Sequence, residues 1–150
     1  MEISKLNKTV SRAAGIAFAA MLAPSVALAQ ECGGPETPCQ IDGGTYHILY
    51  PENSGIAGIV MHLHGGGSSG RSMLGSGLAD EALARGYVFV APNGEHPEAV
   101  WPKDWSVRAD NMDFDRDDAT FLSAVLADVR SQANLADAPF LLAGFSRGGS

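Results

Sequence analysis

The chain has 150 residues, of which 45% are hydrophobic and 18% charged, and its formal net charge is −7. Without residues 1–29 it keeps seven Lys and Arg against sixteen Asp and Glu, a net charge of −9. This acidity excludes nucleic acid as a partner and argues against binding to anionic membranes. The composition fits a soluble protein that acts on uncharged molecules.

The amino terminus has the pattern of an export signal. Three basic residues before position 13 precede an apolar stretch, residues 13–26, and an Ala-Leu-Ala cleavage sequence at 27–29. The apolar stretch is shorter than the roughly 20 residues that a membrane span requires. We therefore predict a signal peptide at 1–29 and a mature part at 30–150, which is exported to the periplasm or the exterior and leaves the membrane after cleavage.

The only two cysteines, Cys32 and Cys39, enclose six residues that include two prolines and two glycines. In an oxidising compartment we expect them to form a disulfide. The alternative is a pair of free thiols in a mobile arm. Because so short a loop constrains the unfolded chain only modestly, we expect the bridge to order the terminus and to contribute little to the fold.

The pattern of apolar residues predicts strands that alternate with helices. Strands are expected at 46–50, 56–63, 87–91 and 140–143, and helices at 78–84 and 118–132. This alternation is typical of a parallel sheet with crossover helices. In the helix at 118–132 apolar residues recur at helical spacing, and either Asp117 or Asp118 is placed to cap its first turn. The connection at 93–115 is long enough to suggest a functional loop.

The strand at 56–63 runs into His64-Gly65-Gly66-Gly67. A glycine-rich loop at the end of a strand can turn backbone N–H groups toward a developing oxyanion, and glycines let a substrate carbonyl come close. We expect the N–H of Gly66 to be such a donor, with Gly67 as a further candidate. A flexible turn after a core strand is the alternative.

Two patterns suggest a metal, and in both a different interpretation is favoured. His62 and His64 are two apart at a strand end and could share one side, but no third ligand lies nearby. Asp113, Asp115 and Asp117 resemble the start of a calcium loop. However, the positions that require Gly and Glu are Asp118 and Ala124, so a capped helix entry is favoured. We predict no metal and no cofactor, and we expect His96 to be exposed.

The strand at 140–143 leads into Gly144-Phe145-Ser146-Arg147-Gly148, a G-x-S-x-G nucleophile elbow. Such an elbow presents a serine on a strained turn, and a Cβ at the flanking glycines would collide with the neighbouring strand and helix. Ser146 is therefore the predicted nucleophile, and the N–H of Arg147 a second oxyanion donor.

In hydrolases with such an elbow, the serine precedes the catalytic acid and the catalytic histidine in the chain. All four histidines of this chain precede Ser146. We therefore expect residues 30–150 to be the amino-terminal part of a larger domain, inactive alone. The apolar run at 140–143 is typical of a strand covered on both faces. In this chain alone we expect it to form an exposed apolar edge.

Several stretches together resemble the secreted polyhydroxybutyrate depolymerase and feruloyl esterase family of α/β-hydrolases. They are HLHGGGS at 62–68, ALARGYVFVAPNG at 82–94, WS at 105–106, DDATFL at 117–122 and GFSRGGS at 144–150. The resemblance implies an α/β-hydrolase fold and an exported serine esterase that cleaves polyhydroxybutyrate-type, feruloyl or acetyl esters through an acyl-enzyme. The family's acid and histidine correspond to no position in this chain. A non-catalytic binding module and a serine peptidase of the same fold are the alternatives.

Overall fold

The fold was analysed in a computed structural model, which describes residues 32–52, 55–96, 103–106, 114–132 and 135–150. The predicted signal peptide, residues 1–29, lies outside the described residues. The strands are β1 (Cys39–Ile41), β2 (Gly44–Leu49), β3 (Gly58–Leu63), β4 (Tyr87–Pro92) and β5 (Phe140–Gly144). The helices are α1 (Gly70–Met73), α2 (Gly77–Ala84), α3 (Asp118–Ser131) and the 3₁₀ helix η2 (Ser146–Gly149). The predicted strands and helices are confirmed to within two residues at each end.

The five strands form one mixed sheet in the order β1-β2-β4-β3-β5. Its core is parallel, because β3 runs parallel to both β4 and β5. The predicted α/β class is thereby confirmed. The sheet differs from the expected pattern at one side, where β2 runs antiparallel to both β1 and β4. The pairing of β1 with β2 has a local cause: Asp42 and Gly43 form a tight hairpin turn, with Gly43 at φ 84°.

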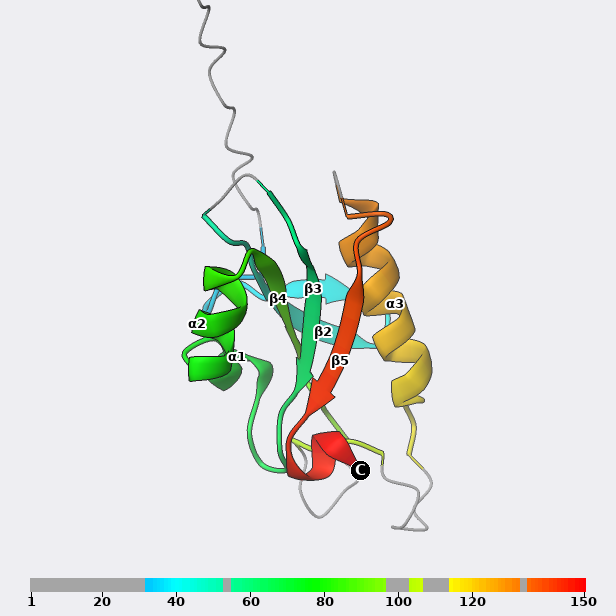
Figure 1. The fold of residues 1–150 in the computed structure, drawn as a ribbon. Helices are drawn as coiled ribbons and strands as arrows, with labels where there is room; N and C mark the ends of the chain where they lie inside the picture. Colours follow the sequence, from blue (N-terminus) through cyan, green and yellow to red (C-terminus); the bar gives the residue numbers. More distant parts are fainter. Residues whose placement is uncertain (1–31, 53–54, 97–102, 107–113, 133–134) are drawn as a thin grey trace, which may run out of the picture.

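Helices cover both faces of the sheet (Figure 1). The chain crosses from β3 to β4 through α1 and α2 on one face, and from β4 to β5 through α3 on the other. The α3 face holds the larger core, in which Phe121, Val125 and Val129 pack with β-strand side chains such as Ile59 and Met61. The smaller core joins α2 to the opposite face of β3 and β4.

Helix α3 begins where the sequence predicts a cap. The side chain of Asp117 accepts hydrogen bonds from the backbone N–H groups of Ala119 and Thr120, at 3.0 and 3.5 Å. These bonds satisfy N–H groups that have no partner inside the helix. Asp117, and not Asp118, is therefore the capping residue.

Strand β5 lies at the edge of the described sheet and pairs only with β3 there. Three of its apolar side chains are exposed by 38 to 57%. They are Phe140, Leu141 and Leu142. The expectation of an exposed apolar edge is confirmed for the described part of the chain.

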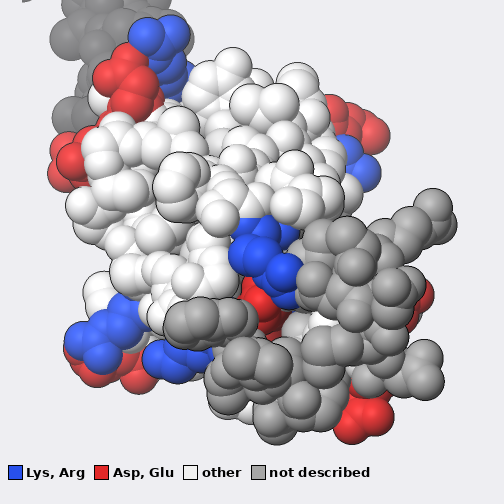
Figure 2. Space-filling view, turned by 90° about the horizontal axis from the view of Figure 1, so that it is seen from below, with Lys and Arg blue, Asp and Glu red and all other residues white. Residues whose placement is uncertain are grey.

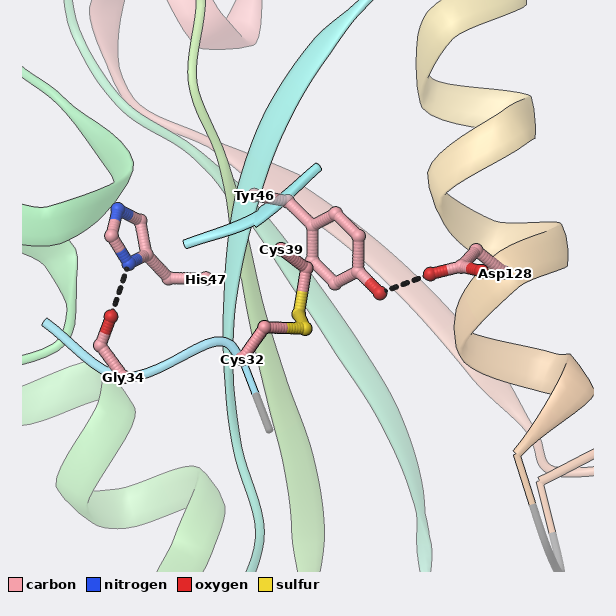
Figure 3. Close-up of a disulfide and its surroundings, with 6 residues drawn as sticks. All are labelled: Cys32, Gly34, Cys39, Tyr46, His47 and Asp128. Atoms are coloured by element: carbon pink, nitrogen blue, oxygen red, sulfur yellow. Dashed lines mark hydrogen bonds between the residues drawn. A yellow bond between two sulfur atoms is a disulfide. The ribbon is translucent and has the colours of Figure 1, made fainter. Parts of the chain in front are cut away.

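The disulfide between Cys32 and Cys39 is confirmed. Figure 3 shows it beside β2, where the Gly34 carbonyl meets Nδ1 of His47 at 2.9 Å. The Ile48 N–H also donates to the Gly33 carbonyl, at 3.0 Å. Cys39 itself is buried in the core on the α3 face. The loop that the bridge closes is therefore ordered against the sheet, and the expectation that the bridge contributes little to the fold stays a prediction.

A hydrogen bond joins the sheet to α3 on the same side of the molecule. The Tyr46 hydroxyl donates to a carboxylate oxygen of Asp128 (Figure 3). The ring of Tyr46 is fully buried. Burial raises the pKa of Tyr46 above its ordinary value, and the bond to Asp128 raises it further. The phenol is therefore a neutral donor at physiological pH.

None of the helices in the described part of the chain is long and apolar enough to cross a membrane.

We expect Tyr46→Phe to lower the free energy of unfolding by about 2 kcal/mol, because it removes a buried hydrogen bond to a charged acceptor. Denaturant unfolding followed by circular dichroism measures this. Tyr87→Phe is the matched control, since the Tyr87 hydroxyl has no hydrogen-bond partner among the described residues, and it should change stability little. Equal stability of the two variants would show that the Tyr46 bond contributes nothing.

Candidate active site

The elbow and the glycine loop meet at the carboxyl ends of β3 and β5. The register pairs Leu63 with Gly144, so the two loops leave the sheet at the same level. The Phe145 N–H donates to the Leu63 carbonyl at 3.1 Å and continues the pairing past the end of β5. The connections after β3 and β4 leave on opposite faces, an arrangement that places ligand sites at this end of an α/β sheet.

Ser146 has a backbone conformation that few side chains adopt. Its φ is 53°, and it is the only non-glycine residue with a positive φ in the part of the chain that the structure describes. Such a conformation costs of order 1–3 kcal/mol and persists only where the surroundings enforce it. In this strained conformation the exposed serine lies between the end of β5 and η2, as a nucleophile elbow requires.

The flanking glycines are required by the space available. A Cβ on Gly144 would lie 2.0 Å from the carbonyl oxygen of Gly148. A Cβ on Gly148 would lie 2.6 Å from the carbonyl oxygens of Leu63 and His64. The elbow therefore packs against both its own 3₁₀ turn and the end of β3, which is the steric demand predicted from the sequence.

We expect Gly144→Ala to lower the free energy of unfolding by about 3 kcal/mol or more, because two backbone segments would have to separate. Gly77→Ala is the control, since a Cβ there meets no atom within 4 Å. It should be neutral or slightly stabilising in helix α2. Thermal unfolding of both variants tests this, and a Gly144→Ala protein as stable as the wild type would contradict the packing described above.

The glycine loop lies beside the elbow. A Cβ on Gly65 would be 3.5 Å from the Cβ of Ser146, and a Cβ on Gly66 would be 3.1 Å from Cγ of Arg147. The N–H of Gly67 donates to the carbonyl of Lys103 at 2.7 Å. Gly67, at φ 78°, therefore uses its N–H to hold the loop, and the prediction that it is an oxyanion donor is not supported. Gly66 and Arg147 remain the two candidate donors.

His64 is a structural residue with a fixed neutral ring. Its Nε2 accepts the N–H of Gly94 at 2.9 Å, so its Nδ1 carries the proton and donates to the Gly65 carbonyl at 2.8 Å. Burial lowers the pKa of His64, and the bond to Gly65 offsets this only in part. With both nitrogens in use, the ring can be neither a metal ligand nor a base for Ser146.

The contacts of His47 and His62 likewise involve residues other than Ser146. Nδ1 of His47 bonds to the carbonyl of Gly34, and the ring of His62 stacks on Phe89. Burial lowers the pKa of His62. The Oγ of Ser146 has no hydrogen-bond partner among the described residues. The structure therefore brings none of these rings to the serine.

The expectation that His96 is exposed is wrong. Only 1% of His96 is accessible, because its ring packs 4.4 Å from that of Phe114 and its Nε2 contacts Asp118 at 2.9 Å. Burial alone would raise the pKa of Asp118. The hydrogen bonds from His96, the Ser106 N–H and Arg116 outweigh it and hold the pKa below its ordinary value. Asp118 is thus ionised, and its carboxylate joins three segments of the chain through hydrogen bonds.

Asp104 was not singled out by the sequence patterns, yet it contacts the elbow directly. Its carboxylate is 1% exposed and binds Arg147 through two hydrogen bonds, at 3.0 and 2.8 Å. Figure 2 looks onto this end of the molecule, and among the described residues basic side chains lie next to acidic ones near the middle of the face. The only signal in the sequence was the length of the connection at 93–115 that contains Asp104.

Two of the three residues that suggested a calcium loop, Asp115 and Asp117, lie in the part of the chain that the structure describes. Asp113 lies outside the described residues, and Asp117 uses its carboxylate to cap α3. In the described ranges, no group of three or more His, Cys, Asp or Glu side chains is arranged to hold a metal ion.

Comparisons with known proteins give partial similarities. No family model and no curated protein matches the chain. Among solved structures it is similar to esterase PE8, with 29% identity over 67% of this chain and 51% of that one and a TM-score of 0.49. It is also similar to a soluble variant of monoglyceride lipase from Saccharomyces cerevisiae in complex with a substrate analog, with 17% identity, 83% and 40% coverage and a TM-score of 0.49.

The chain therefore spans about half of the length of the esterase and less of the lipase. Both TM-scores are below 0.5. The α/β fold therefore rests on the strand order and register described above.

Proposed function

We propose that the whole protein containing this chain is a serine hydrolase that cleaves carboxylic esters, with Ser146 as its nucleophile. One observation carries the proposal: Ser146 is held at φ 53° on an exposed turn between a parallel strand and a 3₁₀ helix. Strain of this kind is concentrated at functional sites. A serine in a purely structural turn would gain nothing from the strain, since Gly or Asn fits such a position at lower cost.

The chemistry follows from the groups around the serine. Oγ of Ser146 attacks the ester carbonyl while a histidine base takes its proton, and the bond to the alcohol breaks as the alcohol receives that proton. The N–H groups of Gly66 and Arg147 stabilise the negative oxygen of the tetrahedral intermediate. Water then releases the acid from the acyl-enzyme. The base and its acid come from elsewhere in the whole protein, because no described histidine bonds to Ser146.

The substrates we propose are neutral esters, namely polyhydroxybutyrate-type oligomers or feruloyl and acetyl esters. The family resemblance of the motifs and the acidic character of residues 30–150 support this choice. We further propose an exported protein. The signal pattern at 1–29 and the disulfide between Cys32 and Cys39, a bond that persists in oxidising compartments, support it.

In the whole protein, Ser146→Ala should reduce kcat for a p-nitrophenyl ester by about 10⁴-fold or more while the fold is retained, because only the nucleophile is lost. Ser123→Ala, on the exposed side of α3, is the control and should leave turnover unchanged. Turnover at the wild-type rate by a pure, folded Ser146→Ala protein would refute the assignment. A panel of hydroxybutyrate, feruloyl and acetyl esters would then rank the substrates by kcat/KM.

Gly66→Ala should lower kcat by as much as about 100- to 1,000-fold and leave KM nearly unchanged. The reason is that an oxyanion donor acts on charge that develops only in the transition state, and a Cβ at this position crowds Arg147. Gly75→Ala is the control, because a Cβ there is in open space. A raised KM with unchanged kcat would assign the loop to substrate binding instead.

A further inference from the structure

Residues 103–106, which we call the clamp segment, contact both halves of the proposed oxyanion site. Two of its contacts hold the glycine loop. The Lys103 carbonyl accepts the N–H of Gly67 at 2.7 Å, and Nε1 of Trp105 donates to the His64 carbonyl at 2.8 Å. The Trp105 ring also packs 5.0 Å from that of His64. The loop that carries Gly66 is thus bonded at both ends to one short segment.

The third contact holds the elbow. Oδ1 of Asp104 accepts from Nε of Arg147 at 3.0 Å, and Oδ2 accepts from a terminal guanidinium nitrogen at 2.8 Å. Oδ1 also accepts the backbone N–H of Trp105 at 2.8 Å, so the carboxylate is oriented from its own side. A two-bond pair of this kind fixes direction as well as distance, which a single contact does not.

The fourth contact anchors the clamp segment to the body of the domain. The Ser106 N–H donates to Oδ2 of Asp118 at 2.6 Å, and Asp118 is itself held by His96 and Arg116. Each of the four residues in the segment therefore makes a different bond, three of them to the site and one to α3. A segment that only covered the site would not need a specific polar contact from each of its residues.

We propose that Asp104 is a positioning residue for catalysis: by binding the Arg147 side chain, it fixes the oxyanion-binding N–H of Arg147 relative to that of Gly66. This inference rests on the proposed function. The physical need is clear, because donors must lie within about 0.5 Å of their productive positions, and a 1 Å misplacement can cost about 100-fold in rate.

The first test compares Asp104→Ala and Asp104→Asn with the wild type in the whole protein, using a p-nitrophenyl ester. Asp104→Ala should lower kcat about 10- to 100-fold with KM changed by less than about twofold. Asp104→Asn should lose less, because its single amide oxygen, in place of Oδ1, still accepts from the Trp105 N–H and from Nε of Arg147. Glu81→Gln is the control, since it removes an exposed ion pair with Arg85 on α2 and should leave kcat unchanged. Thermal unfolding at the assay pH corrects each rate for unfolded protein.

The second test asks whether Asp104 acts through Arg147. If it does, Asp104→Ala combined with Arg147→Ala should have a kcat within about twofold of that of Arg147→Ala alone. Losses that multiply, an unchanged kcat in Asp104→Ala, or a loss confined to KM would each overturn the proposal.

A measurement that needs no turnover separates this inference from the proposed function. Amide hydrogen exchange in residues 145–149 should become faster in Asp104→Ala than in Glu81→Gln. Exchange at the wild-type rate would overturn the positioning role even if Ser146→Ala is inactive. Faster exchange together with full activity of Ser146→Ala would instead refute the proposed function, and with it a positioning role in catalysis.

Discussion

The close approach of the elbow to the end of β3 is the constraint on which the site depends. Carbonyl oxygens of Leu63 and His64 occupy the space next to Gly148, and the Gly148 carbonyl occupies the space next to Gly144. No side chain larger than hydrogen fits between these backbones. This contact brings the serine loop and the glycine loop together, and it forces Ser146 into a conformation that an isolated turn would avoid.

Polar contacts then fix what the packing brings together. Asp104 and Asp118 are both nearly inaccessible, and a buried carboxylate is costly unless its oxygens are satisfied. Each is satisfied by an arginine and by the backbone N–H of a residue in the clamp segment. Such buried pairs add little net stability, since the cost of desolvation offsets most of the attraction. Their contribution here is directional, because they fix how residues 103–106 lie against the elbow and against α3.

The sequence predicted the features that depend on local pattern. Apolar periodicity located the strands and helices, and the motif around Ser146 predicted an elbow whose glycines are confined by steric contacts. The disulfide followed from the spacing of the cysteines and the predicted export. These predictions succeed because the relevant physics, burial on one face or a clash at one residue, acts within a few positions along the chain.

The features that the sequence did not predict are of a different kind. His96 was expected to be exposed because it lies in the long connection at 93–115, yet a partner 22 positions later helps to bury it. Gly67 was assigned to the oxyanion site although Lys103, far along the chain, takes its N–H. Strand β1 was missed because three residues carry no period, and it forms only through pairing with β2. For His96 and Gly67 a contact between distant segments decides the outcome, and a single sequence does not display such contacts.

The position of the elbow explains why side-chain contacts matter so much to it. In the described sheet β5 has hydrogen bonds to β3 alone, and three of its apolar side chains are exposed. A strained residue persists only when its surroundings determine it from several directions. The sheet holds the elbow from one side only, where the Leu63 carbonyl accepts the Phe145 N–H and the backbone after Leu63 packs against the elbow. The ion pair between Arg147 and Asp104 supplies a second direction, from a segment that is itself tied to α3. In the proposed mechanism, the orientation of the oxyanion donors therefore depends on a buried carboxylate in a connecting loop as much as on the strand that carries the serine.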